Sequence, residues 1–280
     1  MRTGTEIHAG MPFDRAYSNP AAPSAIQPAS RAARKSPSDC LIALILASGC
    51  LLPGARAQEA PPNLAKRIAH QESETQALRN EYNYRQTMEF AELDDHGAQT
   101  GVYREERDVI LSPEHERTER MIGKPLLTLK RLRMTDEDFQ DVRGIQPFVM
   151  TEDQLWNYDT RFRGDETVDG VDCWVLQVRP RQILQGQRLF DGMLWADKKD
   201  FAIVRIEGQA VPQIMSTKSE NLFPRFTTVR EIVDGHRFPV YTFADDTLPF
   251  SKGLQRVRMT IRYTQYKRFG AESTIKFEKP

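Results

Sequence analysis

Residues 256–263 read RVRMTIRY, a run in which apolar side chains occupy every second position. Successive side chains of a β-strand point to opposite faces of a sheet, so this alternation produces one apolar face and one polar, basic face. The run therefore predicts a strand in a sheet with one packed side and one side in water. The apolar face holds Val257, Met259, Ile261 and Tyr263, and the other face holds Arg256, Arg258, Thr260 and Arg262.

Strand-like runs continue upstream as far as Tyr158, separated by turn signals at residues 168–170, 196–200 and 234–236. Short clusters of Asp and Gly between apolar runs are typical of β-hairpins. The plainest hairpin joins residues 226–233 to residues 238–243. The C-terminal half is therefore predicted to be antiparallel β-structure.

An earlier hairpin is predicted where Tyr82, Tyr84, Gln86, Met88 and Phe90 alternate with polar residues. The polar turn at residues 94–97 leads from this run into residues 103–111, and a further strand is predicted near residues 126–132.

Helices are expected in only two places. Asn63 is a suitable N-cap for a helix that reaches about Arg79, with Leu64, Ile68 and Leu78 as a sparse apolar face. Such a weak stripe suits a helix that lies across a surface that is already apolar.

The second helical region is an insertion at residues 135–157. Thr135 and Asp138 resemble a capping box, and Phe139, Val142 and Ile145 follow at helical spacing. Thr151 and Gln154 repeat the signature and place Leu155 and Trp156 on a short second helix. These spacings predict helices between two blocks of strands.

Residues 1–57 have the order of regions found in a secretory signal. Basic residues at 31–35 precede an apolar run at 41–52, and Ala55-Arg56-Ala57 follows. The apolar run is shorter than the roughly 20 residues that cross a bilayer. We therefore expect export with cleavage after Ala57, a periplasmic location and one domain over residues 58–280. Ala47-Ser48-Gly49-Cys50 loosely resembles a lipobox and would instead give an outer-membrane lipoprotein, but alanine stands where leucine is favoured.

Charge and cysteine content narrow the function classes. Residues 1–57 hold six Lys or Arg and three Asp or Glu, which leaves 33 basic and 36 acidic residues. A near-neutral domain with interleaved charges does not favour nucleic acid as a partner. Cys173 is the only cysteine outside the leader, so no internal disulfide forms, and its apolar neighbours favour packing over nucleophilic catalysis.

Signals for catalysis, metal or cofactor binding are weak in the sequence. The histidines outside the leader are scattered, and the acidic residues at 165–172 span a predicted hairpin without the ligand spacing of an EF-hand. Asp94, Asp95 and His96 lack a serine in a nucleophile-elbow context, and no phosphate-binding glycine loop occurs. We therefore expect no enzyme activity, no metal and no cofactor.

Large apolar side chains are abundant in the predicted strands, while few helices are available to cover them. Two interpretations follow: an ordinary filled core, or a curved sheet that encloses an apolar cavity for lipid or acyl chains.

Two segments carry a family resemblance. Residues 168–180 read VDGVDCWVLQVRP, and residues 189–208 read LFDGMLWADKKDFAIVRIEG. This succession of strand, basic residue, proline and Trp-Ala-Asp hairpin resembles the outer-membrane lipoprotein-sorting family, with its LolA-like periplasmic lipoprotein carriers. Residues 227–245 and 263–277 extend the similarity over nearly the whole chain after the leader.

The resemblance implies a mainly β fold with a few helices: an unclosed antiparallel β-barrel, or half-pipe, lidded by helices. It also implies that lipid or lipoprotein acyl chains bind in the concave cavity, without catalysis. The residues expected to contact such a ligand are Phe139, Val142, Ile145, Leu155 and Trp156 of the lid, with Trp174 and Trp195 as strand contributors, either of which can face outward.

The alternative is a structural, regulatory or protein-interaction module of the envelope, with a filled core and an exposed strand edge that pairs with another envelope protein. Cavity volume distinguishes this alternative from the lipid-binding interpretation.

We expect N-terminal sequencing of the exported protein to begin at Gln58, because Ala55 and Ala57 stand at the two positions that a signal peptidase reads. A product that begins at an acylated Cys50 would contradict this cleavage and make the protein a lipoprotein.

Overall fold

The computed structural model describes residues 59–112, 116–144, 150–184, 186–215 and 220–269. The signal region, both cleavage alternatives, His115 and Ile145 lie outside these residues, so the expectations about them remain predictions.

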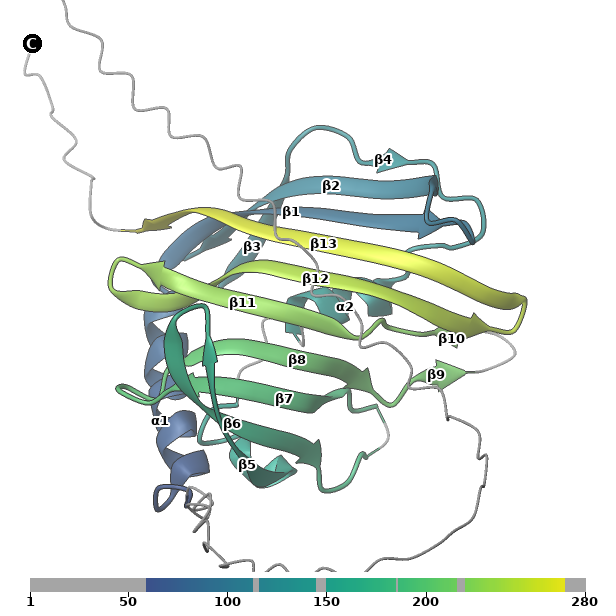
Figure 1. Ribbon diagram of the computed structural model, residues 1–280. Coiled ribbons are helices and arrows are strands. Elements are labelled where there is room, and N and C mark those ends of the chain that lie inside the picture. The colour runs from purple at the N-terminus through teal and green to yellow at the C-terminus, as the bar shows by residue number, and fades with distance from the viewer. Residues whose placement is uncertain (1–58, 113–115, 145–149, 185, 216–219, 270–280) are drawn as a thin grey trace, which may run out of the picture. The chain divides into compact units, whose positions relative to one another are not determined.

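Most of the described residues form one antiparallel sheet of 11 strands (Figure 1). The strand order is β3-β2-β1-β13-β12-β11-β8-β7-β6-β5, with β4 paired to β2. The two ends of this order do not pair with each other within the described residues, so the sheet stays open. The predicted fold class, an unclosed antiparallel β-structure with few helices, is confirmed.

The elements have the following bounds: α1 (Leu64–Arg79), β1 (Tyr82–Leu93), β2 (Gln99–Leu111), β3 (Arg117–Met121), β4 (Leu126–Leu127), α2 (Asp136–Gly144), the 3-10 helix η1 (Leu155–Asn157), β5 (Tyr158–Val168), β6 (Val171–Pro180), β7 (Leu189–Asp197), β8 (Ile203–Val211), β9 (Ile214–Met215), β10 (Glu220–Asn221), β11 (Phe226–Val233), β12 (His236–Phe250) and β13 (Gly253–Arg268). β9 and β10 form a separate two-stranded sheet.

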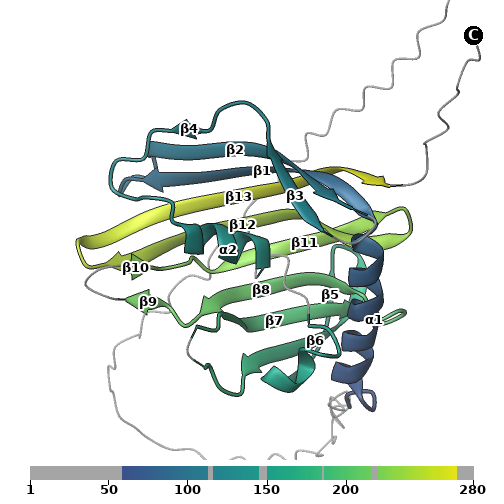
Figure 2. The same cartoon turned by 180° about the vertical axis from the view of Figure 1, so that it is seen from behind.

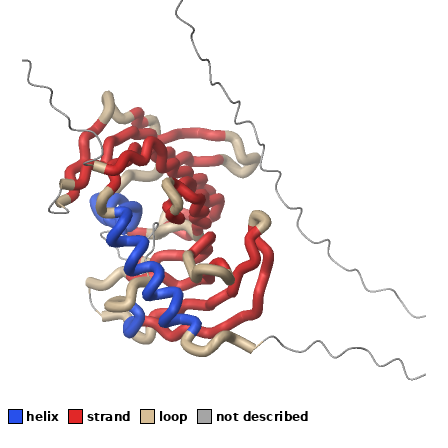
Figure 3. The backbone as a smooth tube through the Cα atoms, turned by 90° about the vertical axis from the view of Figure 1, so that its left-hand side faces the viewer, coloured by secondary structure: helices blue, strands red, loops and turns tan. Residues whose placement is uncertain are grey.

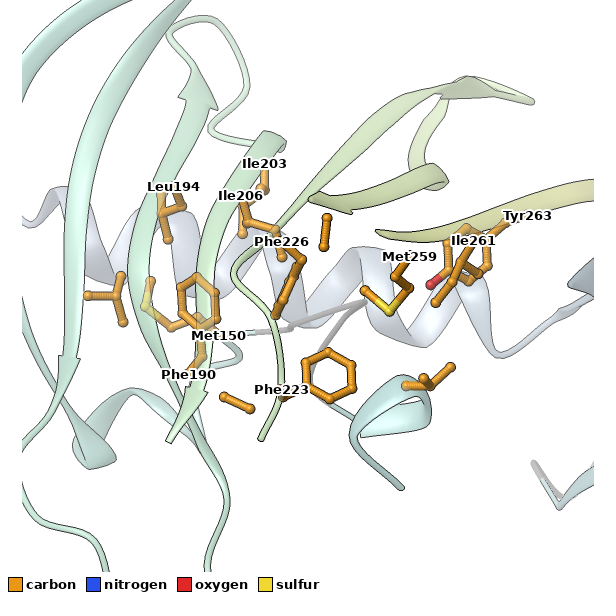
Figure 4. Close-up of a cluster of buried hydrophobic side chains, with 14 of the residues drawn as sticks. Met150, Phe190, Leu194, Ile203, Ile206, Phe223, Phe226, Met259, Ile261 and Tyr263 are labelled. Atoms are coloured by element: carbon orange, nitrogen blue, oxygen red, sulfur yellow. The ribbon is translucent and has the colours of Figure 1, made fainter. Parts of the chain in front are cut away.

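The last strand, β13, lies in the interior of the sheet and joins its two halves. It pairs with β1 on one side and with β12 on the other, with Met88 opposite Ile261 and Ala244 opposite Met259. Met259 and Ile261 are buried, whereas Arg258 and Arg262 are exposed, as the alternation predicts. Figure 4 shows Met259, Ile261 and Tyr263 beside Phe223 and Phe226 in the main core.

The sheet is curved, and its helices lie on one face. Register shifts interrupt five strand pairs, for example between Asn83 and Arg85 and between Val229 and Arg230. Such bulges bend a strand and increase its twist. Figure 2 shows α1 and α2 in front of the same face of the sheet, and Figure 3 shows the strands curving around that side.

Helix α1 is attached to the sheet by a buried ion pair. Glu72 accepts a hydrogen bond of 2.7 Å from Nη1 of Arg230 on β11, and both side chains are at most 2% exposed. Leu64 and Ile68 on the same helix face join the main core. The predicted helix is confirmed, but Asn63 has a left-handed backbone and its side chain makes no capping hydrogen bond.

The helical insertion is confirmed: α2 forms its first part, and η1 is the short second helix that carries Leu155 and Trp156. The Thr135 hydroxyl accepts a 3.2 Å hydrogen bond from the Asp138 amide, and the Asp138 carboxylate accepts a 2.8 Å bond from the Thr135 amide, which completes the capping box. The second capping signature gives only the three residues of η1. Within the described residues, the buried Thr151 hydroxyl makes no hydrogen bond, and the Gln154 amide donates to the Thr151 carbonyl oxygen at 3.0 Å, so the second capping box does not form.

The prediction of one strand at residues 126–132 is wrong in its length. Only Leu126 and Leu127 pair, with β2. Residues 130–132 leave the sheet, and their backbone amides bond the buried carboxylate of Glu92 instead of a strand. A strand that sequence analysis missed, β3, lies just before them; its sequence RTERM is too polar to give an apolar alternation.

The hairpin turns at Asp169-Gly170 and Asp234-Gly235 are confirmed. All four residues have positive φ, between 48° and 84°, as the type I′ turn of a two-residue hairpin requires. The pairing of β1 with β2 and of β7 with β8 confirms the other predicted hairpins.

A second, smaller core cluster lies on the other face of β6, β7 and β8, where alternate side chains point away from the main core. Trp195 belongs to it together with Cys173 and Val204, whereas Leu194, the neighbour of Trp195, belongs to the main core. Trp195 therefore lies on the face of the sheet away from the main core.

We expect Ile261→Asp to lower the melting temperature strongly, because it places an unpaired carboxylate at a site with no solvent exposure. The control is Arg262→Asp on the opposite face, where Arg262 only stacks on Tyr241 at 5.1 Å. A surface change of this kind should cost about 0.5 kcal/mol. Equal losses in thermal unfolding would show that the strand parity is wrong.

Candidate functional site

A cavity of about 710 Å³ lies between the sheet and the segment that contains α2. Met88 and Phe90 of β1 and Met259 of β13 contribute apolar side chains from the sheet, and Val142 contributes one from α2. The other lining residues are Lys130, Arg131, Leu132, Arg133, Met134, Thr135, Asp138, Leu222, Phe223, Phe250, Lys252, Gly253 and Gln255. The cavity is thus bounded by the apolar face of the sheet and by residues that cover it.

Residues 128–135, here called the strap, form one wall of the cavity and are held by Glu92. The carboxylate of Glu92 accepts hydrogen bonds from the amides of Lys130 (2.9 Å), Arg131 (2.7 Å) and Leu132 (2.6 Å). Glu92 has no solvent exposure. A buried carboxylate is tolerated where hydrogen bonds replace its lost hydration. The Glu92 carboxylate therefore requires the strap amides, and these amides require the carboxylate as their acceptor.

The strap also depends on a glycine in β2. A Cβ atom at Gly101 would come within 2.7 Å of both the Glu92 carboxylate and the Thr128 carbonyl oxygen. Two hydrogen bonds hold the start of the strap here: Thr128 donates its amide to the Val102 carbonyl at 2.8 Å, and its hydroxyl accepts from the Val102 amide at 3.0 Å. Only glycine permits this close approach.

Helix α2 is fixed at both ends. Its start is the capping box of Thr135 and Asp138, and its first turn carries Asp136, Glu137 and Asp138, which suits the positive end of the helix dipole. Farther along, the buried Asp141 forms an ion pair with Arg188, just before β7. Burial raises the pKa of Asp141, and the guanidinium of Arg188 opposes this effect. Polar contacts therefore set the position of the helix above the cavity.

The structure places the seven expected ligand residues in different surroundings. Val142 lines the cavity, and Phe139, one turn earlier, is half-buried and packs edge-on against Tyr103 at 5.8 Å. Leu155 lines a separate pocket of about 320 Å³ beside the start of α1. Trp156 is 65% exposed and lines neither cavity.

Trp174 and Trp195 do not line the cavity either. Trp174 packs against the main core, with its ring 6.0 Å from that of Phe162. Trp195 lies on the opposite face, and its indole nitrogen donates to Glu166 at 2.8 Å. Ile145 is outside the described residues. Ligand binding by the seven residues remains a prediction.

Sequence analysis missed Glu92 and the strap. One signal was present: the inward positions of the first hairpin strand are the even-numbered residues from Tyr82 to Phe90, and Glu92 is the next of them. A carboxylate at an inward position needs a partner from elsewhere in the chain.

The residues considered for catalysis have structural contacts. Cys173 has no solvent exposure, and burial raises its pKa to about 11, so the thiol is protonated at neutral pH. In the turn before β2, the Asp94 carboxylate accepts hydrogen bonds from the amides of His96 and Ala98. These bonds give Asp94 a structural role in the turn. Asp165 on β5 forms an ion pair with Lys198, just after β7.

Two further results concern the described part of the chain only. It contains no group of three His, Cys, Asp or Glu residues placed to hold a metal ion. No helix within it has the length and apolar character needed to cross a membrane.

The sequence matches no protein family model and no curated protein. Solved structures with a similar fold include a LolA superfamily protein from Nitrosomonas europaea (14% identity, 72% of this chain, 92% of that chain, TM-score 0.36). An outer membrane lipoprotein-sorting protein domain from Vibrio parahaemolyticus is also similar (12% identity, 76% and 96%, TM-score 0.36). A third is the Pseudomonas aeruginosa MucA/MucB complex (16% identity, 69% and 93%, TM-score 0.22). The names of the first two include the LolA-like and lipoprotein-sorting family that the sequence resembles.

We expect Glu92→Ala to destabilise the protein by about 1 to 3 kcal/mol, since it leaves buried amide donors of the strap without their acceptor. Hydrogen exchange should become faster at the amides of residues 130–132. The control is Glu89→Ala on the outward side of the same strand, where the carboxylate pairs with the exposed Arg104. Unchanged exchange at the strap in the Glu92 variant would contradict this anchoring role.

Proposed function

We propose that this chain is a non-enzymatic protein of the cell envelope that binds lipid or lipoprotein acyl chains in the cavity beneath α2 and the strap, as a carrier or sensor. One observation carries the proposal: a cavity of about 710 Å³ lies against the apolar face of an open sheet. Binding sites for small molecules typically measure roughly 300–1,000 Å³ and are lined mostly by apolar side chains.

Acyl chains suit such a site because they need no specific polar contact along their length. Burying each methylene contributes about 0.8 kcal/mol, so a chain of a dozen carbons provides substantial affinity. The thioethers of Met88, Met134 and Met259 line the cavity, and methionine adapts its shape to irregular ligands. Affinity of this kind leaves little motif in a sequence.

The proposed location rests on the leader at residues 1–57. Removal of this leader would release the domain into the periplasm, where lipids and lipoproteins pass between membranes. Acylation at Cys50 would instead attach the same domain to a membrane.

The alternative function, a protein-interaction module, has one observation in its favour. The open sheet presents β3 and β5 as edge strands within the described residues, and beside the β3 edge Leu126 and Leu127 are 48% and 63% exposed. Unpaired edges and exposed apolar side chains are features that partner proteins use. This module would need no ligand in the cavity.

A fluorescent fatty-acid probe should bind the delipidated, folded protein saturably and be displaced by long-chain lipids. Val142→Asp should weaken this binding at least about tenfold, since it places a charge in the apolar cavity. The control is Ile232→Asp at the far end of β11, where the apolar side chain is already 65% exposed. It should leave binding unchanged.

Adsorption to any exposed apolar patch predicts a different result, namely binding that does not saturate and is insensitive to Val142. That outcome would remove the lipid-binding proposal and favour the interaction module.

A further inference from the structure

Four basic side chains line the cavity and are exposed to solvent: Lys130, Arg131, Arg133 and Lys252. Three belong to the strap, and Lys252 belongs to the turn between β12 and β13. None of the four forms an ion pair within the described residues. They are therefore a group of cations without counter-charges at one site, in a domain whose total charge is near zero.

Several basic residues elsewhere on the sheet form ion pairs with carboxylates. On the face opposite the main core, Arg256 and Arg258 of β13 both bind the Asp245 carboxylate. Arg104 pairs with Glu89 across β1 and β2. Other exposed basic residues, among them Arg161, Arg163 and Arg262, also lack an ion pair within the described residues, so the distinctive feature of the cavity is that four such cations line one site.

The carboxylates nearest the cavity are already occupied. Asp138 lines it but bonds the Thr135 amide and hydroxyl, and burial raises its pKa. Glu92 bonds the strap amides. Even if Asp138 and Glu92 are both counted as charged, the four cations outnumber these two carboxylates. Asp136 and Glu137 in the first turn of α2 do not line the cavity.

Apolar and basic side chains alternate along the strap. Leu132 and Met134 are half-buried and pack against the main core, while Arg131 and Arg133 are exposed. Because Glu92 fixes the strap backbone, this alternation is held in place relative to the sheet. The strap therefore joins the apolar interior to the four exposed cations at the cavity, Lys130, Arg131, Arg133 and Lys252, here called the rim.

We propose that the ligand of this cavity is an amphiphile with an anionic head, whose acyl chain lies against the apolar face of the sheet and whose carboxylate or phosphate lies among Lys130, Arg131, Arg133 and Lys252. This inference rests on the proposed function and adds the head-group class. Lysine and arginine are the side chains that recognise such anions, and the low polarity beside the rim strengthens the attraction.

The test compares two lipids with the same palmitoyl chain: lysophosphatidylglycerol, which is anionic, and lysophosphatidylcholine, which is zwitterionic. Each displaces the fluorescent probe from the delipidated, folded protein at concentrations below micelle formation. The anionic lipid should bind about tenfold more tightly at low salt, and the difference should shrink as salt screens the rim. Inorganic phosphate alone should not displace the probe.

The variant with Lys130→Gln, Arg131→Gln, Arg133→Gln and Lys252→Gln should lose this preference and keep its affinity for lysophosphatidylcholine. Glutamine leaves the backbone amides that Glu92 holds. A control variant with the same change of net charge carries Arg161→Gln, Arg163→Gln, Arg262→Gln and Lys267→Gln, four exposed positions that do not line the cavity. It should retain the preference.

Equal affinity for the two lipids, with Val142→Asp still weakening both, would overturn the anionic-head inference and leave the proposed function standing. Equal loss of preference in both charge variants would also overturn it, because net charge and not the rim would then be responsible. No saturable binding of either lipid would overturn the proposed function itself.

Discussion

An open sheet with one apolar face has to be covered by other parts of the chain, and this constraint governs the whole structure. The strand order ends at β3 and β5 without closing, so α1, α2 and the strap must cover the concave side. Helix α1 is attached through the buried pair of Glu72 and Arg230. Breaking a buried pair of this kind typically costs about 3 to 5 kcal/mol, because the remaining charge stays in the interior.

Each of the three covering segments is held by a buried carboxylate. Glu72 binds across to β11, Glu92 holds the strap, and Asp141 ties α2 to Arg188. Apolar contacts are non-directional, whereas hydrogen bonds to a carboxylate fix distance and orientation. These polar contacts therefore help to set the position of the cover, and a cavity of about 710 Å³ lies beneath α2 and the strap.

This arrangement accounts for the absence of a functional motif in the sequence. A cavity lined by Met88, Phe90, Met259 and Val142 uses residue types that also fill ordinary cores. Its basic rim is likewise dispersed, with three cations on the strap and Lys252 far along the chain. Only the sheet pairing of β1 with β13 brings these parts together.

The sequence by itself determined most of the strands, the type I′ turns at Asp169 and Asp234 and the capping box at Thr135, because alternation, backbone sterics and capping act over a few residues. Tertiary structure decided the rest. The strap leaves the sheet because Glu92 captures amides 38 to 40 residues away. Likewise, Trp195 lies on the face away from the main core because Leu194 and Ala196, on either side of it, pack into that core. Which partner satisfies a buried charge, and which face a side chain occupies after a register shift, depends on distant segments that no local pattern specifies.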